Sequence, residues 1–186
     1  FRRLAENIQS TTHYVTTTAD EVRASGLLKD RIVITYPETA GNDMAVLQAA
    51  ADEWKNKWDH WTQYCFEQHY AYVNPILIIQ VLNGTGGKLT DTNLDDCIEK
   101  IEERTGFKLE SGQVVHTFGG TTASLMVNGL EVRYEEPSRI AENRNIRVVF
   151  FKENLSTGWD CPRAETMMSF KHANDATYIA QLLGRM

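Results

Sequence analysis

Residues 76–90, ILIIQVLNGTGGKLT, place a run of apolar β-formers directly before a glycine-rich loop that carries a lysine. The near-continuous apolar run over residues 75–82 is typical of a strand buried on both faces, as in a parallel sheet. The loop has the composition of a phosphate-binding P-loop but not its spacing. With Gly87 and Lys88 as the glycine–lysine pair, Leu82 stands where the motif needs its first glycine, and Leu89 where it needs a hydroxyl.

Helical and strand patterns alternate along the chain on either side of this stretch. Apolar residues three or four apart predict a helix over residues 42–72 and an amphipathic helix over residues 91–106 that ends at Gly106. Strands are predicted over residues 113–120, 146–151 and 165–170, a short helix after Pro137, and a last helix that begins at Asp175. Such alternation indicates an α/β fold in which a parallel β-sheet is flanked by helices.

The first forty residues differ from the remainder, so we expect two parts, residues 1–40 and 41–186. The first part is polar and rich in threonine, and it carries a potential helical turn from Thr18 to about Gly26. A β-like run, RIVITYP at residues 31–37, predicts an appended strand. Because the chain starts at Phe1 rather than at Met, we expect it to belong to a longer polypeptide, with this first part as a connector.

Composition and charge exclude several classes of protein. The chain has 186 residues and a formal net charge of −6. This charge argues against a protein that binds nucleic acid by itself, but it does not exclude a local strip of contacts. No apolar run approaches the roughly 18 residues that a membrane-spanning helix needs. The cysteines, Cys65, Cys97 and Cys161, are odd in number and share no CxxC spacing, as expected for reduced thiols in a cytoplasmic protein.

The richest local signal is residues 148–170, VVFFKENLSTGWDCPRAETMMSF, followed by YIAQLLGRM at residues 178–186. In open α/β sheets, ligands bind outside the carboxyl ends of the strands. Gly158 permits close approach of the backbone, and Asp160 can accept a hydrogen bond from a sugar hydroxyl or orient a cation. Arg185 is a fixed positive charge suited to phosphate. We therefore expect a ligand site built from the loop after the strand at residues 146–151.

These segments resemble motifs of superfamily 2 helicases and translocases. STGWDCP is similar to motif V and QLLGRM to the beginning of motif VI, in the form found in the helicase-like (Res) subunits of type III and type I restriction enzymes. PILIIQV resembles the motif IV strand that opens the second RecA-like domain, and ASGLLKDRIVI resembles the segment ahead of it. The likeness covers roughly residues 22–186. It implies a three-layer RecA-like fold of the P-loop NTPase type, truncated within motif VI.

The resemblance also implies an activity and partners. The parent protein would hydrolyse ATP with Mg²⁺ and translocate along or unwind duplex nucleic acid, with DNA favoured over RNA. Its partners would be the first RecA-like domain of the same parent chain and a modification or specificity subunit, with no membrane involved. The fragment itself would be inactive as an ATPase and would hold no cofactor tightly, because the P-loop and the acidic magnesium-binding motif belong to the first domain.

The resemblance to the helicase family also implies roles for individual residues of this chain. The resemblance implies nucleotide contacts for Gly158, Asp160 and Gly184, and catalytic roles for Gln181 and Arg185, with no resident metal. It implies nucleic-acid contacts for Asn83, Gly84, Lys88, Ser156 and Thr157.

Two departures from the family pattern bear on these roles. Lys152 and Glu153 stand where many members have Thr-Asp. The chain also stops at Met186, before the further arginine that serves as the arginine finger in the family.

Other readings of the same residues stay open. The loop at residues 83–88 is either a phosphate contact or a flexible turn, and a stand-alone α/β anion-binding module is the competing function. The tryptophans at positions 54, 58 and 61 fit helix packing better than base stacking. His60, Cys65 and His69 lack the spacing of a metal site, and Cys161 fits a buried thiol better than a nucleophile. Trp159 either anchors its loop in the interdomain cleft or packs beneath it.

Overall fold

The computed structural model of the chain describes residues 15–25, 32–34, 43–120, 123–156, 159–171, 181–184 and 186, and divides the chain into two compact units, residues 1–35 and 36–186. In the first unit, helix α2 spans Ala19–Ala24 and begins at a capping box. The Glu21 N–H donates to Thr18 Oγ1 (3.2 Å), and the Thr18 N–H donates to Glu21 Oε2 (2.7 Å). The predicted helical turn is therefore confirmed.

The strand predicted over residues 31–37 is not formed at the residues of it that are described. Ile32, Val33 and Ile34 lie outside any strand and are exposed.

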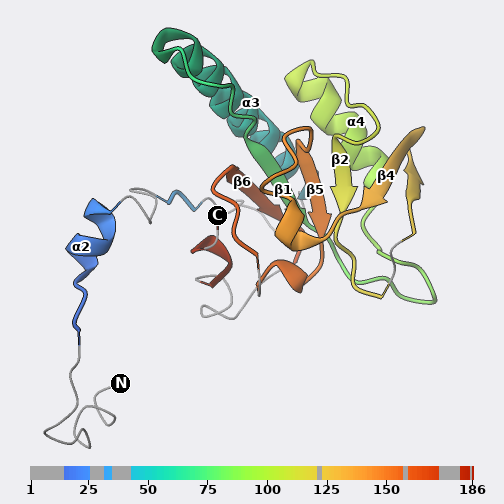
Figure 1. Ribbon diagram of the computed structural model, residues 1–186. Helices are drawn as coiled ribbons and strands as arrows, with labels where there is room; N and C mark the ends of the chain where they lie inside the picture. The colour runs from blue at the N-terminus through green and yellow to red at the C-terminus, as the bar shows by residue number, and fades with distance from the viewer. Residues whose placement is uncertain are drawn as a thin grey trace, which may run out of the picture. The chain divides into compact units, whose positions relative to one another are not determined.

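The second unit is built on a six-stranded sheet in the order β3-β4-β2-β5-β1-β6 (Figure 1). Its strands are β1 (Ile76–Gln80), β2 (Val114–His116), β3 (Leu125–Val127), β4 (Leu130–Tyr134), β5 (Val148–Phe151) and β6 (Ala164–Ser169). All neighbours pair in parallel except β3, which runs antiparallel to β4 at the edge. The predicted parallel sheet is thus confirmed in its centre and mixed at one edge.

Strand β1 lies inside this sheet, and every one of its residues is buried. It pairs in parallel with β5 on one side and with β6 on the other, so its backbone groups are satisfied along both edges. The apolar run at residues 75–82 predicts this environment correctly. Its one polar side chain, Gln80, is 2% exposed.

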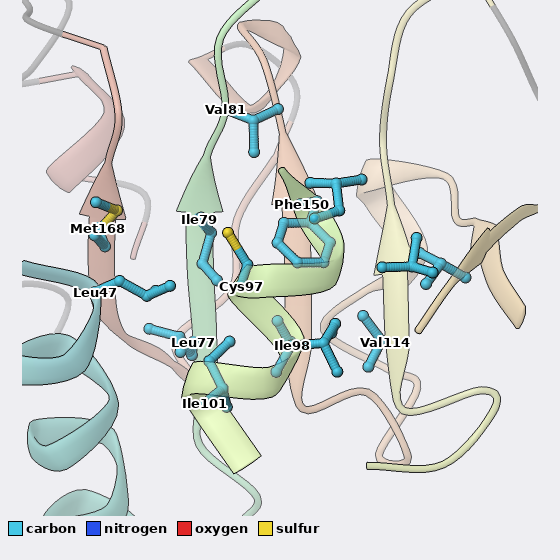
Figure 2. Close-up of a cluster of buried hydrophobic side chains, with 14 of the residues drawn as sticks. Leu47, Leu77, Ile79, Val81, Cys97, Ile98, Ile101, Val114, Phe150 and Met168 are labelled. Carbon is cyan, nitrogen blue, oxygen red and sulfur yellow. The ribbon is translucent and has the colours of Figure 1, made fainter. Parts of the chain in front are cut away.

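One face of the sheet is covered by helices α3 (Asp43–Gln68) and α4 (Leu94–Thr105). Figure 2 shows Leu47 of α3 and Ile98 of α4 among the strand side chains Leu77, Val114 and Phe150. The α4 prediction is confirmed in detail: the helix begins at an Asn93 cap and ends at Gly106, whose φ of 70° favours glycine. Helix α3 is fixed to the start of β1 by the Trp54 indole N–H, which donates to Pro75 O (2.8 Å).

The other face is covered by the short 3-10 helices η1 (Pro137–Arg139) and η2 (Asn154–Ser156) and by the loop that follows η2. Trp159, Cys161 and Leu182 join its buried cluster. Helical elements therefore lie on both faces, and the architecture is a three-layer α/β arrangement consistent with a RecA-like fold. None of the helices in the described part of the chain is long and apolar enough to cross a membrane.

Some predicted elements differ from the observed ones. The helix predicted after Pro137 is a single 3-10 turn that ends at Arg139. The hairpin of β3 and β4 was not predicted, although Asn128 and Gly129 have the positive φ angles (48° and 79°) of a type I′ turn. Of the predicted last helix, residues 181–183 are helical, and the proposed cap Asp175 lies outside the described residues.

Arg163 ties this second face to the amino end of the sheet. Its guanidinium donates to four backbone carbonyls, those of Ala141 (3.1 Å), Ile140 (2.8 Å), Asn143 (2.9 Å) and Asn74 (2.7 Å). Burial lowers the pKa of Arg163 from its ordinary value. The side chain thus joins the turn after η1 to Asn74, just before β1.

We expect Arg163→Met to lower the free energy of unfolding by about 2–4 kcal/mol, because the substitution removes the side-chain donor from four partly buried carbonyls, of which that of Asn143 keeps the Ile146 N–H. Urea unfolding followed by tryptophan fluorescence measures the change. Arg139→Met, at an exposed arginine of the adjacent 3-10 turn, is the control and should change stability by less than about 0.5 kcal/mol. Equal effects of the two substitutions would contradict the assignment.

Candidate functional site at the carboxyl edge of the sheet

The carboxyl ends of β1 and β5 form the point at which the chain changes direction across the sheet. From β1 the chain passes through α4 to β2, whereas from β5 it passes through η2 to β6 on the opposite side of β1. Because β1 and β5 are neighbours, their outgoing loops diverge over opposite faces. In doubly wound α/β sheets, ligands bind in the crevice at such a switch point.

A buried amide holds three strand ends together at this edge. Gln80 Nε2 donates to the backbone oxygen of Lys152 (2.6 Å), just after β5, and Ser169 Oγ at the end of β6 donates to Gln80 Oε1 (2.9 Å). Ser169 Oγ also accepts from the Lys171 N–H (3.1 Å). Since a buried amide without partners is costly, these bonds fix the spacing of the loops after β5 and β6.

Glu153 extends this network toward solvent. Its Oε1 accepts from Lys171 Nζ (2.7 Å) and from Asn83 Nδ2 (3.4 Å). The hydrogen bond and charge of Lys171 lower the pKa of the Glu153 carboxyl. Asn83, the first of the predicted nucleic-acid residues, is therefore placed beside the loop after β5.

The loop after β2 is joined to the same edge. The amide of Asn154 in η2 donates to the backbone oxygen of Thr117, and Thr117 Oγ1 donates back to Asn154 Oδ1 (2.9 Å). Lys152 Nζ lies 5.0 Å from the centroid of the Phe118 ring. The Lys152–Glu153 pair, a departure from the family pattern, thus contacts neighbours on both sides: Lys152 toward β2, and Glu153 toward β1 and β6.

The glycine-rich loop after β1 forms a turn closed by internal hydrogen bonds. A Cβ on Gly84 would lie 1.9 Å from the backbone oxygen of Lys88, so a side chain at this position would force the backbone to shift. Asp91 Oδ1 accepts from both the N–H and the hydroxyl of Thr85 (3.2 Å each), and Thr90 Oγ1 donates to Leu82 O (2.7 Å). Lys88 is exposed on this turn.

The amino end of α4 is closed to an external anion. The Asn93 side chain accepts from the N–H groups of Asp95 (3.1 Å) and Asp96 (3.4 Å), and two carboxylates occupy the first turn. The Asp95 carboxylate also accepts from the Asn128 N–H in the β3–β4 turn. A P-loop needs that helix end free for phosphate, so the structure gives a second reason, beyond motif spacing, why this loop does not grip nucleotide phosphate.

The remaining predicted site residues fall in two groups. Thr157, Gly158 and Arg185 lie outside the described residues, and Ser156 is described only by its backbone in η2. Asp160, Gln181 and Gly184 are described and exposed.

Asp160 lies in the segment between η2 and β6. The backbone oxygen of its neighbour Cys161 accepts from the Ala164 N–H (2.9 Å), which places Asp160 just before the amino end of β6. No hydrogen bond or ion pair among the described residues joins the side chains of Asp160 and Gln181. Both nevertheless adjoin one buried cluster, through Trp159 and Leu182, so they lie on the same face of the sheet.

Several alternative sites are excluded by burial. Cys161 is 0% exposed and packs as a core thiol, and burial raises the pKa of Cys97 to about 12. Trp159 is likewise fully buried, so its ring packs beneath the loop. Trp54 is buried in the core, which confirms packing for this residue, and no group of three metal-binding side chains occurs in the described part of the chain.

Sequence reasoning missed the Gln80–Ser169–Lys171 part of the site. The available signal was a single amide in an otherwise apolar strand, but its partners lie 72 and 89 residues away along the chain.

Comparison with known proteins gives no match to a family model, to a curated protein or to a solved structure. Function must therefore be inferred from the residues and the geometry of the chain itself.

We expect Gln80→Leu to remove the side-chain donor of the Lys152 carbonyl and the bond from Ser169 to β1, while Ser169 keeps Lys171, and to lower the free energy of unfolding by about 1–3 kcal/mol. Amide exchange at residues 152–154 and 170–171 should accelerate more than exchange in α4. Gln63→Leu, at an exposed glutamine of α3, is the matched control. If Gln80→Leu left exchange at both loops unchanged, the amide would not be what holds this edge.

Proposed function

We propose that the chain is the second RecA-like motor domain of an ATP-dependent DNA helicase or translocase of the restriction-subunit type. The observation that carries the proposal is the position of the motif-like segments in the fold. The motif IV-like strand is β1, and the loop with the motif V-like sequence leaves the carboxyl end of the adjacent strand β5. The motif IV-like strand therefore ends at the switch point at which α/β sheets bind their ligands, and the loop with the motif V-like sequence begins there.

The nucleotide would be held mainly by the first motor domain, and this chain would complete the site. Asp160 is exposed between two buried neighbours, so its carboxylate is presented rigidly for a sugar hydroxyl or a water molecule. Gln181 is exposed beside the buried Leu182 on the same sheet face, and Arg185 would compensate the charge that builds on the transferred phosphoryl group. ATP and Mg²⁺ are accordingly cofactors of the parent protein.

The nucleic-acid track would run along the carboxyl edge. Gly84 lets the loop after β1 close tightly, which presents Lys88 and the neighbouring backbone to a phosphate chain. Asn83 lies at the foot of this loop, and Ser156 ends η2 on the other side of the switch point, with Thr157 next in the sequence. Because the chain carries a net charge of −6, the contact would be a narrow strip and strongly salt-dependent.

The competing function, a stand-alone anion-binding module, is disfavoured by the same geometry. The cap and carboxylates at the amino end of α4 occupy the position where an anion would bind. The Thr85 N–H is likewise taken by Asp91. An independent enzyme that uses Cys161 as a nucleophile is disfavoured because that thiol is fully buried.

The composite-site proposal predicts that the 186-residue chain alone has no magnesium-dependent ATPase activity above background. In the longer polypeptide that carries both motor domains, Arg185→Ala should lower kcat about 100- to 1,000-fold, with a much smaller change in the KM for ATP. Steady-state phosphate release with saturating duplex DNA measures both. Arg139→Ala is the control and should retain full activity. Turnover by the isolated chain, or full activity of the Arg185 variant, would contradict the proposal.

A second prediction concerns the track. Lys88→Ala should weaken duplex DNA binding by a similar factor for unrelated sequences and lower the slope of log K against log salt by about 1. Fluorescence anisotropy over a salt series measures it. Lys108→Ala is the matched control, since the Lys108 side chain is 85% exposed and pairs with Glu102 at the far end of α4. If the two variants bound DNA identically, the proposed contact between DNA and the loop after β1 would be contradicted.

A further inference from the structure

The loops after three neighbouring strands meet at one carboxylate oxygen on the carboxyl edge of the sheet. Strands β5, β1 and β6 lie side by side in that order and run parallel (Figure 1). Glu153 follows β5, Asn83 follows β1 and Lys171 follows β6. Glu153 Oε1 accepts from Lys171 Nζ (2.7 Å) and from Asn83 Nδ2 (3.4 Å). The Glu153–Lys171 ion pair therefore joins the two strands that flank β1.

The two partners of this ion pair differ in exposure. The Lys171 side chain is 20% exposed, whereas the Glu153 side chain is 68% exposed. The Lys108–Glu102 pair after α4 has the same N–O distance, 2.7 Å, but the opposite arrangement, with an 85% exposed lysine and a 13% exposed carboxylate. At the carboxyl edge, it is thus the cation that packs into the fold and the carboxylate that covers it from the solvent side.

The backbone that carries the Lys171 ammonium is tied to the sheet. The Lys171 N–H donates to Ser169 Oγ (3.1 Å), and Ser169 Oγ donates to the side-chain oxygen of the buried Gln80 (2.9 Å). Gln80 also donates to the backbone oxygen of Lys152 (2.6 Å), the residue before Glu153. The lysine and the carboxylate thus stand on loops whose separation is fixed by the same amide.

The groups that face Glu153 are cations and a neutral donor. The hydrogen bond and charge of Lys171 lower the pKa of the Glu153 carboxyl, and the charge of Lys152 lowers it further. A single carboxylate balances only one of these two ammonium groups. Asp91, the carboxylate of the neighbouring loop after β1, accepts instead from the N–H and hydroxyl of Thr85 (3.2 Å each).

This arrangement suits a phosphate oxygen. An ammonium and an amide that converge on one anionic oxygen are donors of the kind that contact the DNA backbone. An ion pair with an exposed partner contributes little to stability, so an external anion can replace the carboxylate at small cost. The position also adjoins the loop that presents Lys88, along which the nucleic-acid track is proposed to run.

We propose that Lys171 and Asn83 bind a backbone phosphate of the nucleic acid, and that Glu153 occupies this position until the phosphate displaces it. The inference rests on the proposed DNA-binding function and adds to it a binding residue, Lys171, and an internal competitor, Glu153. Because the carboxylate returns when the phosphate leaves, it weakens the grip on each phosphate. That property suits a protein that must release DNA repeatedly as it moves.

The test is a double-mutant cycle on duplex DNA binding by the 186-residue chain, measured by fluorescence anisotropy. Glu153→Gln should tighten binding about 3- to 10-fold, because it removes the competing charge and keeps the size of the side chain. Lys171→Met should weaken binding about 3- to 10-fold and lower the slope of log K against log salt by about 1. In the Lys171→Met background, Glu153→Gln should change binding by less than about twofold, because the carboxylate competes through Lys171.

Glu67→Gln and Lys108→Met are the matched controls. Each makes the same charge change at an exposed side chain outside the carboxyl edge, Glu67 in the last turn of α3 and Lys108 after α4. Salt screens charges at such separations, so both should change DNA binding by less than about twofold. Urea unfolding establishes that every variant is folded under the binding conditions.

Several outcomes would overturn the inference. Equal tightening by Glu153→Gln with and without Lys171 would be a general effect of charge, and weaker binding by Glu153→Gln would make the ion pair structural. Binding of the fluorescent nucleotide mant-ATP that follows the cycle, while DNA binding does not, would assign the position to a nucleotide phosphate. DNA binding that depends on Lys88 but not on Lys171 would overturn this inference alone. Binding that depends on neither lysine would contradict the track itself.

Discussion

Burial of β1 on both faces and both edges is the constraint that positions the rest of the second unit. Each fully buried Ile or Leu of this strand contributes about 1.5–3 kcal/mol relative to an exposed position. Its parallel pairing with β5 and β6 requires crossover connections, which bring α4 over one face of the sheet and the η1 and η2 segments over the other. The strand ends at Gln80, where a buried amide must find partners on its neighbours.

That requirement links the core to the candidate site. The Gln80 amide binds groups at the ends of β5 and β6, so it helps to position the loops that follow these strands. Glu153 and Lys171 then continue the same network outward to Asn83. This network thus links the ends of β1, β5 and β6 at the carboxyl edge of the sheet.

Local chemistry made much of the fold predictable. The Asn93 cap, the Gly106 ending and the apolar stripe between them define α4 without reference to any distant residue, and the run of Ile and Leu in β1 is equally local. The order of the strands was not predictable. Strand β5 lies between β1 and β2, although it follows both of them in the sequence by many residues, and no local pattern indicates this pairing. The hairpin at Asn128 and Gly129 was present in the sequence as a turn signal and was overlooked, since its strands are short and half exposed.

The candidate site was predictable only in outline for the same reason. The motifs pointed to the loops after β1 and β5. The position of Asp160, however, depends on the path of the connection from β5 to β6, which no local sequence pattern predicts. Gly84, by contrast, was recognised as part of a loop, yet its role follows from a single contact with the Lys88 carbonyl that only the folded turn creates.

Hydrogen–deuterium exchange of the proposed longer polypeptide, which would carry both motor domains, tests the central claim most directly. It should be measured without ligand, with duplex DNA, and with DNA plus a non-hydrolysable ATP analogue. We expect DNA to protect residues 82–92, and the nucleotide to add protection at residues 159–163 and 181–184 while the carboxyl end of α3 stays unchanged. Protection confined to other surfaces, with the loops after β1 and β5 unaffected by either ligand, would contradict the assignment of this chain as a motor domain.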